Sequence, residues 1–359
     1  MPNINWLLVF LPLTLLLAYA LPHTPDYLLF LSAAIAIVPL AALIGQSTEN
    51  LSATTGPTLG GLLNATFGNA TEMIIAFFAL RAGKIEVVKA SITGSMISNM
   101  LLVLGLALFL GGLRYQKQCF NKEIAGALSS LLVIVMIAFL VPAMFDLTER
   151  FGGVTAANAG IGDAHFALAA SAVLIALYVG NLIFSLVTHK DLISIADEPH
   201  EGPIWPVRRS LGTLAAATVA VAWLAEILVG SLEGFSRQLG LTEVFAGLII
   251  IPIVGNAAEH AASVFALKNK MDLAIQIALG ATIQIALLVA PVLVIASFLI
   301  GQPMDLVIHR PLELVGLIGA ALITASVARD GETNWLEGAM LLGVYLLLAL
   351  AFFFLPAGV

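Results

Sequence analysis

Long apolar runs separated by short polar breaks are the main pattern of this chain. About eleven runs are long enough to cross a bilayer, since a membrane-spanning helix needs roughly 20 apolar residues. A run such as 128–140 lacks the alternating polarity of a membrane β-barrel strand. The pattern therefore predicts an all-α integral membrane protein. The expected spans are 4–20, 27–49, 61–81, 87–111, 122–144, 163–188, 209–231, 243–267, 272–300, 306–327 and 334–355.

The longest polar connection divides these spans into two groups. If the first span is set aside, five spans lie on each side of the connection, and an odd number places the second group upside down in the membrane. Inverted repeats of this kind are typical of secondary transporters. We expect an extra N-terminal transmembrane helix at 1–24, a first five-helix repeat at 25–188, an acidic cytoplasmic linker at 189–208 and a second five-helix repeat at 209–359.

Basic residues favour one orientation of the chain. A cytoplasmic N-terminus places nine of the 15 lysines and arginines on the inner side, as the positive-inside rule prefers. The acidic linker is then cytoplasmic, the C-terminus lies outside, and the cell membrane is the expected location. The linker itself has two interpretations, a solvated connection or a regulatory segment that senses cations.

One segment occurs twice. GNATEMIIAFFAL, which starts at Gly68, aligns without gaps on GNAAEHAASVFAL, which starts at Gly255, and seven of the 13 positions are identical. Downstream, GSMISN from Gly94 aligns with GATIQI from Gly280 after one gap. Chance similarity of apolar segments seldom places a Gly, an Asn and a Glu in register. Gly68 and Gly255 are also candidates for helix interruptions, where a transporter commonly holds its ion.

The two repeated glutamates, Glu72 and Glu259, lie in the middle of expected spans. A charged carboxylate at the centre of a membrane helix costs at least about 2.5–3.5 kcal/mol, and two at similar depth repel each other. No Lys or Arg lies at the same depth, because Arg81 and Lys268 come near the helix ends. A metal ion or protons must therefore neutralise these carboxylates, and alternation between the two is what an antiporter requires.

Oxygen ligands surround both glutamates in the sequence. Ca²⁺ takes six to eight oxygens, whereas the motifs hold no thiolate and a single imidazole, which disfavours Zn²⁺ and Cu⁺ as the main cargo. For the hydroxyl-bearing residues, interhelical hydrogen bonding is the alternative interpretation. The candidate metal ligands are Glu72, Glu259, Asn69, Asn256, Ser95, Ser98, Thr282 and Gln284.

Three further polar residues are candidates for a proton path or gate. Glu226 lies within its span, and Glu49, its partner in the repeat, lies nearer a helix end where it could simply face water. His260 follows Glu259 directly and points about 100 degrees away around the helix. A hydrogen-bonded structural histidine is the alternative for His260.

Composition excludes several other classes of protein. Hydrophobic residues make up 60% of the chain, charged residues 10%, and the mean hydropathy is +1.04. The net charge of −7, with scattered basic residues, disfavours a nucleic-acid partner. Cys119 is the only cysteine, and no H-E-x-x-H motif or nucleophile with its base indicates an enzyme or a resident cofactor. A channel is distinguished by flux without coupling to H⁺ or Na⁺.

The paired blocks GNATE and GNAAEH, with GPTLGGLLNATF before the first and GSMISN after it, resemble the proton/calcium antiporter (CAX) family of the cation/calcium exchanger superfamily. The resemblance covers essentially the whole chain. It implies that Glu72 and Glu259 are the central Ca²⁺ ligands, that Asn69 and Asn256 lie near the ion, and that the molecule associates as a homotrimer. It also implies support from Ser95, Ser98 and Gln284, and acidic vestibule positions at Glu49 and Glu226.

The coupling ion is expected to be H⁺. The sodium/calcium branch of the superfamily has Pro directly before the motif glutamate, whereas Thr71 and Ala258 stand there in this chain. The sequence thus predicts a Ca²⁺/H⁺ antiporter that works by alternating access, with Ca²⁺ and protons competing for the two glutamates in the lipid bilayer. A sodium-coupled Ca²⁺ exchanger and a Mn²⁺/H⁺ antiporter are the alternatives.

Overall fold

The computed structural model describes residues 4–21, 23–153, 156–188 and 205–356. It divides into two compact units, of which unit 1 holds residues 1–91 and 182–258 and unit 2 holds residues 92–181 and 259–359. Each unit thus combines segments from both expected repeats. Most of the acidic linker, residues 189–204, lies outside the described residues, so the structure does not bear on its role.

Unit 1 is built around two long helices, α2 (Asp26–Thr55) and α10 (Val207–Leu239), which pack along each other. The rings of Phe30 and Phe235 stack with centroids 4.0 Å apart. At the start of α2, Asp26 lies against Gly234 so closely that a Cβ there would collide with the carboxylate. The other elements are η1 (Ile4–Val9), α1 (Phe10–Tyr19), α3 (Pro57–Phe67), α4 (Ala70–Arg81), η3 (Phe184–Thr188), α11 (Glu243–Phe245), η4 (Ala246–Ile250) and α12 (Ile251–Gly255).

Unit 2 contains the remaining helices, and its best-packed contact joins α6 (Leu104–Arg114) to α17 (Trp335–Phe354). Gly338 permits this contact, because a Cβ there would collide with the backbone of Phe109. A capping box between Asn334 and Glu337 starts α17. The other elements are α5 (Ile85–Ile97, in unit 1 as far as Ser91), η2 (Ser98–Val103), β1 (Gln118–Cys119), α7 (Lys122–Phe151), α8 (Ala156–Ile183), α13 (Ala257–Ala266, in unit 1 as far as Ala258), α14 (Met271–Gln284), η5 (Ile285–Val289), α15 (Ala290–Leu299), α16 (Pro311–Val327) and β2 (Glu332–Thr333).

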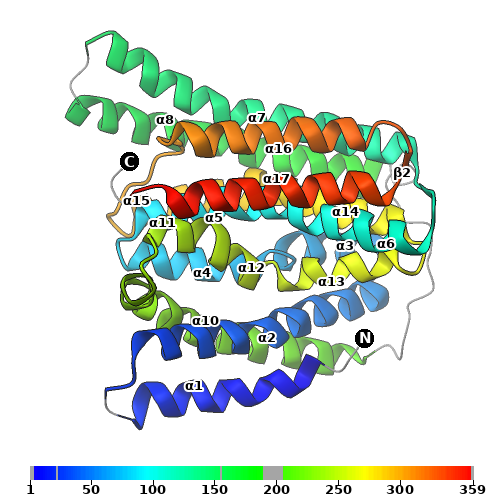
Figure 1. The fold of residues 1–359 in the computed structure, drawn as a ribbon, viewed down its shortest axis with the longest axis horizontal. Coiled ribbons are helices and arrows are strands. Elements are labelled where there is room, and N and C mark those ends of the chain that lie inside the picture. Colours follow the sequence, from blue (N-terminus) through cyan, green and yellow to red (C-terminus); the bar gives the residue numbers. More distant parts are fainter. Residues whose placement is uncertain (1–3, 22, 154–155, 189–204, 357–359) are drawn as a thin grey trace. The chain divides into compact units, whose positions relative to one another are not determined.

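Nearly all described residues lie in helices or short connections (Figure 1). These helices coincide with the apolar runs of the sequence. Seven helices among the described residues are long and apolar enough to cross a membrane, and three shorter apolar helices accompany them. On α7, large side chains such as Ile134, Ile137 and Val141 are exposed, as expected for a surface that lipid covers. The all-α membrane fold predicted from the sequence is confirmed.

One small element was not predicted. The strands β1 and β2 pair antiparallel, with Gln118 opposite Thr333 and Cys119 opposite Glu332. Two-residue strands between helices leave no periodic pattern in the sequence. Beside them, the exposed pair of Lys117 and Glu332 forms a salt bridge. The hydrogen bond to Glu332 and its negative charge raise the pKa of Lys117 above its usual value.

Cys119 tests the expected orientation of the chain. It is a free, exposed thiol in the connection between α6 and α7, which a cytoplasmic N-terminus places inside the cell. We expect a membrane-impermeant maleimide to label it in inside-out vesicles and not in intact cells. Cys119→Ser serves as the control for labelling elsewhere. Labelling of intact cells would show that the orientation is reversed.

Candidate ion site

Glu72 lies in unit 1, directly after a break between two helices. Asn69 separates α3 from α4 with φ −106° and ψ 26°, whereas Gly68 keeps helical geometry. The interruption expected at Gly68 therefore falls one residue later, at a residue in the sparsely populated bridge region of backbone conformation. Glu72 is in the first turn of α4, and it is buried with 8% of its surface exposed.

Glu259 repeats this local arrangement. Asn256 separates α12 from α13 with φ −79° and ψ 23°, and Glu259 is in the first turn of α13 with 7% of its surface exposed. Again the break is at the Asn and not at Gly255. The oxygen Oε2 of Glu259 is buried and has no hydrogen-bond partner among the described residues. A bound ion or a proton could satisfy this oxygen.

The helix starts give both glutamates a favourable electrostatic position. The first backbone N–H groups of a helix have no intrahelical acceptors, and together with the helix dipole they stabilise a carboxylate by about 0.3–1 kcal/mol. This is less than the roughly 2.5–3.5 kcal/mol that a charge costs at the membrane centre. Helix starts alone thus offset only part of the cost of burying these charges.

Within unit 1, the second motif touches the first. A Cβ added to Gly255 would lie 3.1 Å from Cγ and 3.8 Å from Oε1 of Glu72, so any larger residue here would press on the side chain of Glu72. Helix α2 also borders the second motif, because a Cβ added to Gly45 would lie 3.8 Å from the Cβ of Ala258. The two copies of the repeated segment are therefore joined at the side chain of one of their glutamates.

The polar residues expected to support the glutamates belong to unit 2. Ser95 and Ser98 are buried on α5 and η2, and α14, which holds Thr282 and Gln284, packs against η2. The hydroxyl of Thr282 donates to the carbonyl oxygen of Ala278 at 2.9 Å, so this hydrogen bond lies within α14 and is not the interhelical one of the alternative interpretation. Its lone pairs stay available to a cation.

Both helices that follow the motifs contain π-helical turns, η2 and η5, at matching places in the two repeats. Such turns are rare and occur often at functional sites. In η2 the side chain of Asn99 is fully buried, and neither its oxygen nor its nitrogen has a partner among the described residues. Asn99 is the last residue of GSMISN and was not chosen as a ligand from the sequence, although an amide in an apolar run was the available signal.

Glu313 is a further buried carboxylate, and sequence reasoning did not single it out. It lies in the first turn of α16 with 2% of its surface exposed, and Thr93 on α5 donates a hydrogen bond to it. Arg310 lies 4.0 Å away. This contact anchors α5 two residues before Ser95. The signal was an acidic residue inside an expected span, the same signal that singled out Glu72.

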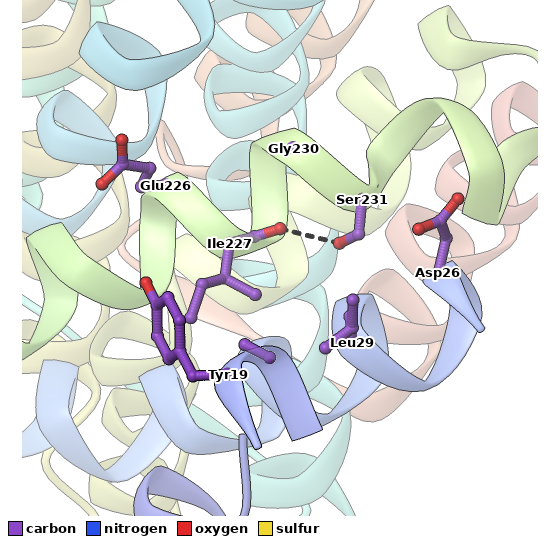
Figure 2. Close-up of a pocket in the computed structure, with 8 residues that line it drawn as sticks. Tyr19, Asp26, Leu29, Glu226, Ile227, Gly230 and Ser231 are labelled. Atoms are coloured by element: carbon purple, nitrogen blue, oxygen red, sulfur yellow. Dashed lines mark hydrogen bonds between the residues drawn. The ribbon is translucent and has the colours of Figure 1, made fainter. Parts of the chain in front are cut away.

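Glu49 and Glu226 are exposed, on α2 and α10 of unit 1. Glu226 lines a pocket of about 360 Å³ between α1, α2 and α10 (Figure 2). Figure 2 shows Glu226 on α10 and Asp26 at the start of α2, with Ile227 and Ser231 between them. The pocket is lined by Ala18, Tyr19, Asp26, Leu29, Glu226, Ile227, Gly230 and Ser231.

The structure thus distributes the predicted residues over both units. Unit 1 holds Glu72, Asn69 and Asn256 around the contact of α4 with α12, together with the exposed Glu49 and Glu226. Unit 2 holds Glu259 with its neighbour His260, and the polar residues of α5, η2 and α14. Among the described residues no group of three His, Cys, Asp or Glu side chains is arranged to hold a metal. Carboxylates alone are therefore insufficient, and a cation site here needs amide, hydroxyl and backbone oxygens as well.

Comparison with known proteins identifies the family. The sequence pattern of the family described as "Sodium/calcium exchanger protein" matches residues 26–187 and 209–354. The chain belongs to this exchanger family. The two matched segments of the exchanger fall within the two expected repeats and omit the whole linker, 189–208, between them.

Similar proteins place the exchanger within its family. It is 45% identical to the Ca²⁺/H⁺ antiporter of Aphanothece halophytica, over 98% of this chain and 96% of that protein. It is 43% identical to the Ca²⁺/H⁺ antiporter ChaA of Bacillus subtilis, over 99% of this chain and all of that protein. The solved structure of native YfkE matches with a TM-score of 0.84 and 38% identity, over 98% and 100% of the two chains. The resemblance to proton/calcium antiporters is confirmed, and the chain is a transporter by family.

The contact between Gly255 and Glu72 yields a test of the motif. Gly255→Ala places a methyl group against Cγ of Glu72, so the carboxylate must shift by a few tenths of an ångström. We expect the rate of Ca²⁺ transport in proteoliposomes to fall by roughly tenfold, because small displacements of a binding group are costly. Gly126→Ala, with open space at its Cβ position, is the matched control. Equal transport rates in the two variants would show that the contact is unimportant.

Proposed function

We propose that the exchanger moves Ca²⁺ across a membrane in exchange for H⁺, by alternating access. The observation that carries the proposal is the pair of buried glutamates, each in the first turn of a helix that follows a break at an Asn. Its relatives of 45% and 43% identity along nearly their full length are Ca²⁺/H⁺ antiporters. Both facts favour Ca²⁺ and H⁺ as the two transported ions.

Ca²⁺ binding requires oxygens and negative charge. We propose that Glu72 and Glu259 provide the charge, and that neutral oxygens complete the six to eight positions Ca²⁺ prefers. Helix breaks beside both glutamates leave backbone carbonyls at the ends of α3 and α12 without their usual partners, which suits a cation. The proposed neutral ligands are Asn69, Asn256, Ser95, Ser98, Thr282 and Gln284.

Protons complete the cycle. Without Ca²⁺, two ionised glutamates would have to pass through the low-dielectric interior, which is unfavourable for each charge. Protonation removes both charges and so permits the return step. Ca²⁺ and H⁺ therefore compete for the same carboxylates, and this competition couples their movements in opposite directions.

Ions must also reach the glutamates from either side of the membrane. We propose that access alternates by movement of outer helices, including α2 and α10, and that Glu49, Glu226 and His260 serve as a gate or proton path. The exposure of Glu226 in a pocket beside α1 supports contact with water or ions. For His260, a structural role stays the alternative.

The remaining organisation is also a proposal. It comprises the two inverted five-helix repeats after an extra first helix, the cytoplasmic N-terminus and linker, and a location in the cell membrane. Association as a homotrimer stays an expectation of the family resemblance. Two alternative pairs of exchanged ions stay open. Exchange of Na⁺ for Ca²⁺ is one, because the family is described as sodium/calcium exchangers. Exchange of H⁺ for Mn²⁺ is the other, because Mn²⁺ also prefers oxygen ligands.

Substitution of the glutamates tests the two-carboxylate site. Glu72→Gln and Glu259→Gln keep the shape of the side chain and remove the charge that both ions require. We expect each variant to fold and to retain less than about a tenth of the wild-type rate of Ca²⁺ uptake. A tenfold loss of rate corresponds to an increase of about 1.4 kcal/mol in the activation free energy of transport. Glu332→Gln, at an exposed carboxylate beside β1, should transport normally. Substantial uptake by either of the first two variants would refute the site.

The coupling ion is tested in proteoliposomes made acidic inside, with Na⁺ absent throughout. We expect the outward proton gradient alone to drive Ca²⁺ uptake, and a proton-selective ionophore to abolish it. A requirement for Na⁺ would favour the sodium-coupled alternative. Competition by Mn²⁺ in the same assay measures the preference between the two divalent cargoes.

A further inference from the structure

Two buried aspartates lie away from the repeated motifs, at the contact of α7 with α8 in unit 2. Asp146 is near the end of α7 with 7% of its surface exposed, and Asp163 is in α8 with 2% exposed. The rings of Phe145 and Phe166 stack with centroids 4.7 Å apart, and Gly162 on α8 lies against Glu149 on α7. These two contacts bracket the aspartates, so the carboxyl of Asp163 faces that of Asp146.

The surrounding charges do not neutralise both carboxylates. On α7, Arg150 donates from Nε to Oδ1 of Asp146 at 2.7 Å, and its single positive charge also acts on Asp163 and Asp305. Glu149, also on α7, adds a third carboxylate, and Gly162 on α8 lies against it. The segment between α15 and α16 contributes Asp305, another acidic neighbour. Glu313 on α16, which packs against α7, is engaged by Thr93 and Arg310.

One atom of the pair indicates what is missing. Oδ1 of Asp163 is buried and has no hydrogen-bond partner among the described residues. Two ionised carboxylates have no hydrogen to share, and burying them together is costly on account of both desolvation and repulsion. A single proton shared between the two carboxyls removes one charge and supplies the hydrogen that the pair lacks.

We propose that Asp146 and Asp163 bind one proton between them, as a second proton-binding site that none of the motif residues contributes to. The proton stays on Asp163 and is donated to Asp146, whose other contact is the guanidinium of Arg150. The pair then carries a single negative charge that Arg150 balances, and it joins α7 to α8. Loss of the proton leaves two adjacent charges with one cation and weakens this helix contact.

The linkage of stability to pH follows from the bound proton. An unfolded Asp loses its proton near pH 3.9, whereas the folded pair keeps one above that value. The folded protein then holds more protons than the unfolded chain, so its stability must fall as pH rises until the pair releases its proton. Asp163→Asn supplies a permanent donor to Asp146 and removes this dependence.

The experiment compares thermal unfolding of the full-length protein and of Asp163→Asn in detergent between about pH 5 and about pH 9. We expect Asp163→Asn to unfold at a higher midpoint temperature than the wild type. The difference between the two midpoint temperatures should grow by at least about 2 °C from the lowest to the highest pH. Glu332→Gln, at an exposed ion pair, should follow the wild type. Parallel curves for wild type and Asp163→Asn would overturn the proposal.

Two further measurements keep the result decisive. If Asp163→Asn does not fold, infrared spectra are recorded at neutral pH in the Glu72→Gln/Glu259→Gln background, where the motif glutamates cannot contribute. A protonated carboxyl band that shifts in frequency when Asp163→Glu is added supports the proposal, and its absence overturns the proposal. Unfolding is also measured with added Ca²⁺ in the Glu72→Gln/Glu259→Gln background, where the proposed transport site is disabled. Stabilisation by Ca²⁺ at high pH that Asp163→Asn abolishes would identify a cation and not a proton as the ligand of the pair.

Discussion

The constraint on which this protein depends is the cost of placing carboxylates inside an apolar membrane protein. Each glutamate of the repeated motif is buried, and each lies at a helix start whose free N–H groups recover only part of that cost. We propose that a bound ion offsets what remains unfavourable, and that Ca²⁺ and protons serve in turn.

The local structure follows from this need. A continuous helix would bond its own carbonyls and leave no backbone ligands, whereas the breaks at Asn69 and Asn256 interrupt that pattern beside the glutamates, as our proposal requires. Gly255 lets the second motif approach the side chain of Glu72, so that the motifs constrain each other within unit 1. The repeat is thus visible in space as well as in sequence, as matched breaks and matched π-helical turns.

Much of this could be predicted from the sequence because it depends on local pattern. Apolar runs located the spans, and the register of Gly, Asn and Glu located the repeat and both helix breaks to within one residue. The division into two units could not be predicted, because it groups segments far apart in the chain. The contacts of Glu313 with Thr93 and of Asp163 with α7 could not be predicted, because they join different helices and are defined only by packing. The ion pair of Asp146 with Arg150 is local, since the two residues are four apart on α7. The two-residue strands carry too little pattern to be recognised.

The central claim is that Ca²⁺ and protons compete for Glu72 and Glu259, and the most direct measurement counts protons released when Ca²⁺ binds. Purified protein in weak buffer near pH 7 is mixed with Ca²⁺ in the presence of a pH indicator, and Ca²⁺ binding is measured in parallel. We predict proton release that accompanies binding in the wild type and disappears in the Glu72→Gln/Glu259→Gln variant. Ca²⁺ binding without proton release in the wild type, or undiminished release in that variant, would contradict the account.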